Sequence, residues 1–158
     1  MASLMLVSAF TACSSDKGGK EITNATLVEA ITNSGAEGVE YNPVTGLDSE
    51  ESEDLDLFFQ MYEMDKENFE AGAFSVSLMN IKAYAIMAVM PKEGAEEAAL
   101  EDIQSYVDAM NQAFEHYLAD QYEVAQNAIL KVQDNGLIIL VMTEDAQTIY
   151  DNIVAALA

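Results

Sequence analysis

The chain of 158 residues contains no arginine and no tryptophan, and it has one cysteine and one histidine. Six lysines oppose 28 aspartates and glutamates, which leaves a formal net charge of −22. Nucleic-acid binding requires a positively charged surface, so this composition argues against it. Without arginine the chain also lacks the side chain that holds carboxylates and phosphates through paired hydrogen bonds, which disfavours anionic ligands. Cations, cationic partners and neutral ligands remain as candidates for what the protein binds.

The single cysteine, Cys13, excludes a disulfide framework and a cysteine-based zinc site. Residues 2–12 ahead of it are uncharged, and they form a run much shorter than the roughly 20 apolar residues of a membrane span. The small residues Thr11 and Ala12 followed by Cys13 resemble a bacterial lipobox, in which the cysteine is acylated and becomes the mature N-terminus. We therefore interpret residues 1–12 as part of a lipoprotein signal peptide and 13–22 as a flexible tether. The alternative is a buried free cysteine near the N-terminus.

Hydrophobic periodicity predicts one α+β domain over residues 23–158, with an α-helical, acidic N-terminal part. Residues 23–33 are expected to form a helix capped by Asn24 or Thr26. Six carboxylates lie within residues 48–56. We expect them to occupy a linker and the exposed first turn of a second helix.

The rest of the domain is predicted to follow the order ββαββα. Residues 72–79 alternate between apolar and polar, which is typical of a half-exposed strand, and 83–90 are apolar throughout, as in an inner strand. Apolar residues at three- and four-residue steps predict a long amphipathic helix over 93–118. Asn135-Gly136 predicts a hairpin within 127–143 through a type I′ turn, and Thr143 is expected to cap a C-terminal helix. We expect a four-stranded, antiparallel-containing sheet with both of these helices on one face.

Several of these features together resemble one protein family. They are the lipobox cysteine, the acidic segment, Met79-Asn80 before a strand, the long helix ending in Tyr117, and the closing Asn-Gly hairpin and helix. The chain resembles the bacterial lipoprotein family catalogued as domain of unknown function 4358, over roughly residues 20–157. This resemblance implies the location and the fold, and it brings no activity, cofactor or site residue with it.

No catalytic constellation is apparent in the sequence. His116, the only histidine, lies about 140° from Ile103, the centre of the apolar stripe of its helix, and should face water. The nucleophile-elbow, S-x-x-K, H-E-x-x-H and phosphate-loop motifs are all absent. The acidic run does not fit an EF-hand, because the sixth position counted from Asp48 is Glu53 and the twelfth is Phe59. We therefore assign no catalytic, cofactor-binding or metal-binding residue.

Paired methionines invite a copper-trafficking interpretation, since thioethers are soft metal ligands. Met87 and Met90 fall in a predicted strand, where a spacing of three residues places them on opposite faces. Met61 and Met64 can share a helix face, but two thioethers alone make a weak site. Packing in the hydrophobic core is the favoured interpretation of both pairs.

These observations predict a protein anchored by lipid at the outer face of the cell membrane, acting as a binding or scaffolding module and not as an enzyme. Its partners would be the membrane, through Cys13, and a basic or neutral protein or ligand of the cell envelope. Either the uncovered sheet face or the 72–79 edge would dock that partner. Two alternatives stay open: a carboxylate-based hydrolase of envelope material, and an acidic surface protein that accumulates cations.

Overall fold

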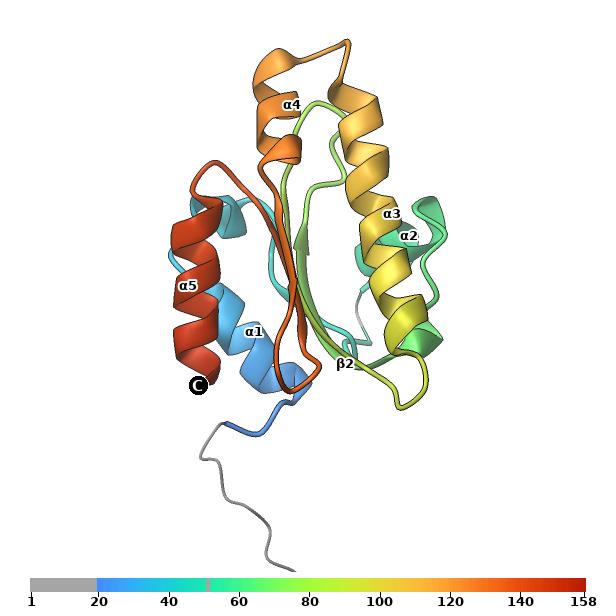
Figure 1. Ribbon diagram of the computed structural model, residues 1–158, viewed down its shortest axis with the longest axis vertical. Coiled ribbons are helices and arrows are strands. Elements are labelled where there is room, and N and C mark those ends of the chain that lie inside the picture. The colour runs from blue at the N-terminus through green and yellow to red at the C-terminus, as the bar shows by residue number, and fades with distance from the viewer. Residues whose placement is uncertain (1–19, 51) are drawn as a thin grey trace, which may run out of the picture.

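The computed structural model describes residues 20–50 and 52–158, so Cys13 and the predicted signal segment 1–12 lie outside the described residues. An antiparallel sheet lies between two layers of helices (Figure 1). Its five strands occur in the order β1-β2-β3-β5-β4. They are β1 Thr45–Gly46, β2 Phe69–Val76, β3 Ala85–Pro91, β4 Ile129–Val132 and β5 Ile138–Met142. The helices are α1 Asn24–Thr32, α2 Glu53–Met61, α3 Glu96–Phe114, α4 Ala119–Gln126 and α5 Ala146–Leu157, with short 3₁₀ turns η1 Glu37–Glu40 and η2 Lys66–Asn68.

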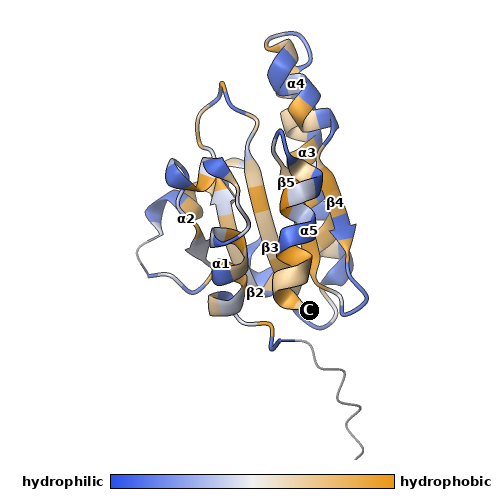
Figure 2. Cartoon of the chain, turned by 90° about the vertical axis from the view of Figure 1, so that its left-hand side faces the viewer, coloured by the Kyte–Doolittle hydropathy of each residue, from blue (hydrophilic) through white to orange (hydrophobic). Residues whose placement is uncertain are grey.

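The α+β class is confirmed, but the expectation of four strands with both helices on one face is wrong. The short strand β1 pairs with β2 as a fifth strand, and α4 adds a helix between α3 and β4. Helices α2 and α3 cover one face of the sheet, and α1 and α5 cover the other (Figure 1). The reason lies in the central strands: Met87 and Leu140 pack on the α3 side, whereas Ile86 and Ile139 pack on the α5 side. Strands that are apolar on both faces need helices on both faces (Figure 2).

Strand β2 is not the half-exposed edge that its alternating sequence suggested. Ser75 in β2 and Ser77 just after it are buried, because the α5 layer and the loop through Asn42 cover that side of the strand. The Ser75 hydroxyl donates a hydrogen bond of 2.6 Å to the backbone carbonyl of Asn42. Both faces of the sheet are covered, so the uncovered face expected from the sequence does not exist, and β1 pairs with Ala73 and Phe74 on the expected 72–79 edge.

The helices differ from the predicted ones at their ends: the long helix expected over 93–118 extends over Glu96–Phe114, and the capping residues change. Thr23, not Asn24 or Thr26, is the N-cap of α1, in a reciprocal capping box with Thr26. The Asn24 side-chain oxygen instead accepts a hydrogen bond of 2.7 Å from the backbone N–H of Gly72, which connects α1 to β2. Thr143 does not cap α5; the N-cap position belongs to Asp145, whose side chain makes no capping hydrogen bond.

The β4–β5 hairpin is confirmed, but its turn is not type I′. Gly136 has a positive φ of 87°, whereas Asn135 does not. The backbone N–H of Gly136 donates to the carbonyl oxygen of Gln133, and the backbone N–H of Gln133 donates to the carbonyl oxygen of Leu137. These two bonds close a three-residue loop. This is the three-residue hairpin loop in which a type I turn is followed by a glycine in the left-handed region.

Different segments of the chain lie at the two ends of the molecule. The segment leading into α1 and the C-terminus of α5 lie at the lower end in Figure 1, where the β4–β5 hairpin also lies, and α4 lies at the upper end. The connections from α1 to η1, from β2 to β3 and from β5 to α5 therefore meet at the upper end, and the candidate site lies there.

Candidate functional site

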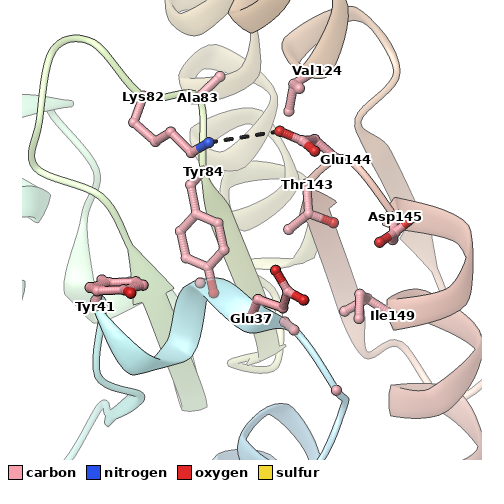
Figure 3. A pocket seen from close by; sticks show the side chains of 13 residues that line it. Glu37, Tyr41, Lys82, Ala83, Tyr84, Val124, Thr143, Glu144, Asp145 and Ile149 are labelled. Carbon is pink, nitrogen blue, oxygen red and sulfur yellow. Dashed lines mark ion pairs between the residues drawn. The ribbon is translucent and has the colours of Figure 1, made fainter.

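A pocket of about 320 Å³ opens beside the ends of the two central strands (Figure 3). Ala83 and Tyr84 immediately precede β3, and Thr143 immediately follows β5. Because Ala85 pairs with Met142 in the sheet, these two segments lie next to each other at the strand ends. The remaining walls come from the η1 segment, α4 and the start of α5. The lining residues are Gly35, Ala36, Glu37, Gly38, Tyr41, Lys82, Ala83, Tyr84, Val124, Thr143, Glu144, Asp145 and Ile149.

Tyr84 fixes one wall of the pocket. Its side chain is buried, and its hydroxyl lies 3.0 Å from that of Ser75, which links the wall to β2. Burial raises the pKa of Tyr84, and the hydrogen bond with Ser75 partly opposes that shift. A Cβ atom at position 38 would overlap the Tyr84 ring, so Gly38 lets the η1 backbone lie directly against the ring. This close packing connects the η1 wall to the sheet.

The opposite wall contains a buried hydroxyl without a partner. The Oγ1 atom of Thr143 is shielded from solvent and makes no hydrogen bond within the described part of the chain. In Figure 3 this oxygen points away from Tyr84 and toward the Asp145 side of the pocket. A hydroxyl buried in this way costs stability, because folding removes its hydrogen bonds to water without replacing them.

The rim is charged and exposed. Glu37, Glu144 and Asp145 contribute three carboxylates and Lys82 one ammonium group, so the lining carries two net negative charges. Lys82 Nζ lies 3.9 Å from Glu144 Oε1, and their side chains are 46% and 76% exposed, which makes a loose ion pair. Beside it, a hydrogen bond from Gln121 lowers the pKa of Asp120, and the charge of Lys82 adds to that effect.

Helix α4 is attached to the pocket through Gln121. Its side-chain oxygen accepts a hydrogen bond of 2.9 Å from the backbone N–H of Ala83, and the side chain is buried. The same residue donates to Asp120 through its side-chain nitrogen. This bond satisfies the backbone where the chain enters β3 and holds Val124 of α4 at the pocket wall.

A second hollow of about 250 Å³ lies on the other side of Tyr41. Its walls include the apolar side chains of Leu55 and Phe74, with Asp54 as the charged residue. The adjoining β2–β3 loop exposes Met79 and Ile81. This hollow has fewer polar groups than the first pocket and no buried hydroxyl, so it is the weaker candidate site.

The residues that the sequence singled out lie elsewhere. His116 is exposed beyond the end of α3, as predicted, and its nearest charged partner is Glu115 at 3.7 Å. Met87 is buried in the core, and Met90 packs on the opposite face of the sheet. Glu53 begins α2, and the first turn of that helix is acidic, as predicted. Over residues 20–50 and 52–158, no three acidic, histidine or cysteine side chains lie close enough together to hold a metal ion.

The fold and the site define a class of protein: a helix-covered antiparallel α+β domain with a small acidic pocket at one end. The chain belongs to the family described as Domain of unknown function (DUF4358), whose family model matches residues 45–153. Searches of curated proteins and of solved structures gave no match. Three sides of the pocket lie within the matched range, and the η1 side, residues 35–41, lies outside it. In the described part of the chain, no helix has both the length and the apolar character that crossing a bilayer requires.

Proposed function

We propose that this protein is a lipid-anchored module on the outer face of the cell membrane that binds a small ligand in the pocket beside β3 and β5. The lipobox pattern that ends in Cys13 supports the anchor. The acidic composition is consistent with it, since a chain with a net charge of −22 gains nothing from anionic headgroups and needs acyl chains to stay at a membrane.

The relative position of the chain entry and the pocket carries this proposal. The chain enters at the N-terminal end of α1, whereas the η1 wall of the pocket follows the C-terminal end of that helix. Helix α5 runs from the pocket back toward the end where the chain enters. Asp145 at its start lines the pocket, and its 12 residues extend for about 18 Å to the C-terminus. A tether attached ahead of α1 would therefore present the pocket on the side away from the membrane.

Binding fits the pocket better than hydrolysis does. Glycoside-type hydrolysis needs two carboxyl groups facing each other across the scissile bond, one of them kept protonated by burial. The carboxylates of Glu37, Glu144 and Asp145 are exposed at the rim, and the buried part of the wall consists of apolar groups and the hydroxyls of Tyr84 and Thr143. A shallow polar rim around an apolar floor is the arrangement of a ligand-binding pocket.

The anchor is tested with Cys13→Ser in a bacterium that processes lipoproteins. Mass spectrometry of the wild-type protein should find an acylated N-terminal Cys13, and the variant should leave the membrane fraction. A wild-type protein recovered from the cytosol with a free thiol would refute the anchor.

The binding role is tested with two exposed tyrosines. Tyr41 lines the pocket and is 84% exposed, and Tyr117 lies away from it and is 68% exposed, so neither side chain contributes much to the core. In a thermal-shift screen of small polar compounds, hits on the wild type should be weakened in Tyr41→Ala and retained in Tyr117→Ala. Hits that survive both substitutions equally would place binding outside this pocket.

A further inference from the structure

The chemistry of the pocket lining indicates what kind of ligand enters it. We infer that the pocket takes a small polar molecule bearing an ammonium group, and this inference rests on the proposed binding function.

The first argument is electrostatic. The lining carries two net negative charges, and the single cation, Lys82, is only loosely paired with Glu144. The Asp145 carboxylate makes no capping hydrogen bond to α5, so it stays available to a ligand. The N-terminus of α5 opposes a cation with a partial charge of roughly half a unit, which is smaller than the negative charge around it. Both the pocket and the whole chain therefore attract cations.

The second argument comes from the aromatic wall. The rings of Tyr41 and Tyr84 lie on one side of the pocket, across from Thr143 and Asp145 (Figure 3). The Tyr41 ring is 84% exposed, so a ligand in the pocket can reach it. An ammonium group beside such a ring gains a favourable cation–π interaction in addition to the attraction of the carboxylates. Carboxylates and aromatic rings around the same pocket suit a cation better than a neutral sugar or an anion.

The third argument is the unpartnered hydroxyl of Thr143. Rotation about χ1 by about 120° moves the hydroxyl of a threonine from one staggered position to the next. Because this hydroxyl has no hydrogen bond in its present orientation, rotation toward the Tyr84 side of the pocket breaks none. A ligand that offers a hydroxyl or carbonyl oxygen next to its ammonium group would give the Thr143 hydroxyl the partner that the fold does not supply.

The experiment uses three sugars of matched size: glucosamine, glucose and glucuronate. Amide chemical shifts of the purified domain are followed by NMR during titration at pH 6.5 and physiological salt. Glucosamine should shift the amides of Ala36, Tyr84 and Thr143, with an affinity at least tenfold higher than that of glucose, and glucuronate should shift none of them. If glucose binds as tightly as glucosamine, the pocket is a binding site but the ammonium inference is wrong.

Two pairs of variants separate the pocket from the general negative charge of the surface. Glu37→Gln should weaken glucosamine binding about three- to fivefold, whereas Glu97→Gln, on the exposed first turn of α3, should leave it unchanged. Thr143→Val should weaken binding and raise the melting temperature, and Thr143→Ser should retain binding. Equal effects of Glu37→Gln and Glu97→Gln, or no shift of the pocket amides with glucosamine, would overturn the inference. The compound screen with Tyr41→Ala tests the binding role independently.

Discussion

The hydroxyl of Tyr106 is buried in the core without a hydrogen-bond partner among the described residues. Tyr106 lies on α3 and is 1% exposed. Its ring packs against Phe58 and Tyr62 of the α2 segment, with ring centroids 5.2 Å and 4.7 Å away. Leaving such a group unpaired costs about 1–3 kcal/mol, because water no longer satisfies it. The ring contributes to packing, and the oxygen detracts from stability.

Tyr106→Phe keeps the ring and removes the oxygen. The substitution removes the cost of the unpaired hydroxyl, but it also removes the contacts that the oxygen makes with its neighbours. We therefore expect the free energy of unfolding to rise by about 1 kcal/mol. For a domain of this size that corresponds to a melting temperature higher by roughly 3–4 °C. Tyr84→Phe is the matched control: it removes a hydroxyl that does have a partner, Ser75, and should lower the free energy of unfolding by about 1 kcal/mol.

Alkaline titration gives a second measure of the same group. Burial raises the pKa of Tyr106 above that of an unfolded tyrosine, about 10, and the nearby Tyr62 adds to the shift. Above pH 10 the unfolded chain therefore loses a proton that the folded chain keeps. The stabilisation present below pH 10 is then lost by up to about 1.4 kcal/mol per pH unit as the pH rises. Tyr106→Phe should show a shallower alkaline loss in urea unfolding. If it were less stable than the wild type at pH 7, the hydroxyl would have a buried partner and the reasoning would fail.

Three further predictions concern packing, a hydrogen-bond link and charge. Gly38→Ala should cost about 1–3 kcal/mol and disturb the pocket amides in NMR spectra, because the new methyl group overlaps a buried ring; unchanged stability and spectra would disprove the close packing. Asp102→Ala should lower the free energy of unfolding by about 1–2 kcal/mol, since its carboxylate joins α3 to the η2 segment through bonds of 3.1 and 3.0 Å. Asp108→Ala, whose carboxylate bonds within its own helix, should have little effect in the same urea titration. Added NaCl should raise the melting temperature by screening the net charge of −22, and Ca²⁺ at equal ionic strength should stabilise no more than Na⁺; a larger shift with Ca²⁺ would indicate a specific site.

Local patterns in the sequence were sufficient to predict most of the elements. The apolar stripe through Ile103 predicted α3, and the continuous apolar run of 83–90 predicted an inner strand, which is β3. The same apolar pattern also indicates where the helices lie, and the prediction did not use it for that purpose. An interior strand that is apolar on both faces implies helices on both faces, which contradicts placing the long and C-terminal helices together. The serines of β2 misled because their burial depends on loops and hydrogen bonds that follow no period.

The pocket could not be predicted from sequence, because it combines segments that are far apart in the chain. Tyr41, Lys82 and Thr143 come from three different connections. None of them belongs to a motif, and the orphan hydroxyl of Thr143 is visible only once its surroundings are known. The sequence predicted that Thr143 caps the C-terminal helix, but α5 begins later and its N-cap position is Asp145. Tertiary structure alone decides whether a threonine after a strand caps a helix or lines a pocket.

The architecture restricts where such a protein can bind anything. Both faces of the sheet are covered by helices, and the edge strands β1 and β4 have only two and four residues, which leaves little backbone to pair with another chain. The ends of the strands remain as candidate binding surfaces. One end carries the β4–β5 hairpin and the entry of the chain, and at the other the connections hold the exposed carboxylates, Tyr41 and the buried hydroxyl of Thr143. The binding function proposed for this domain is assigned to that end, because the pocket lies there.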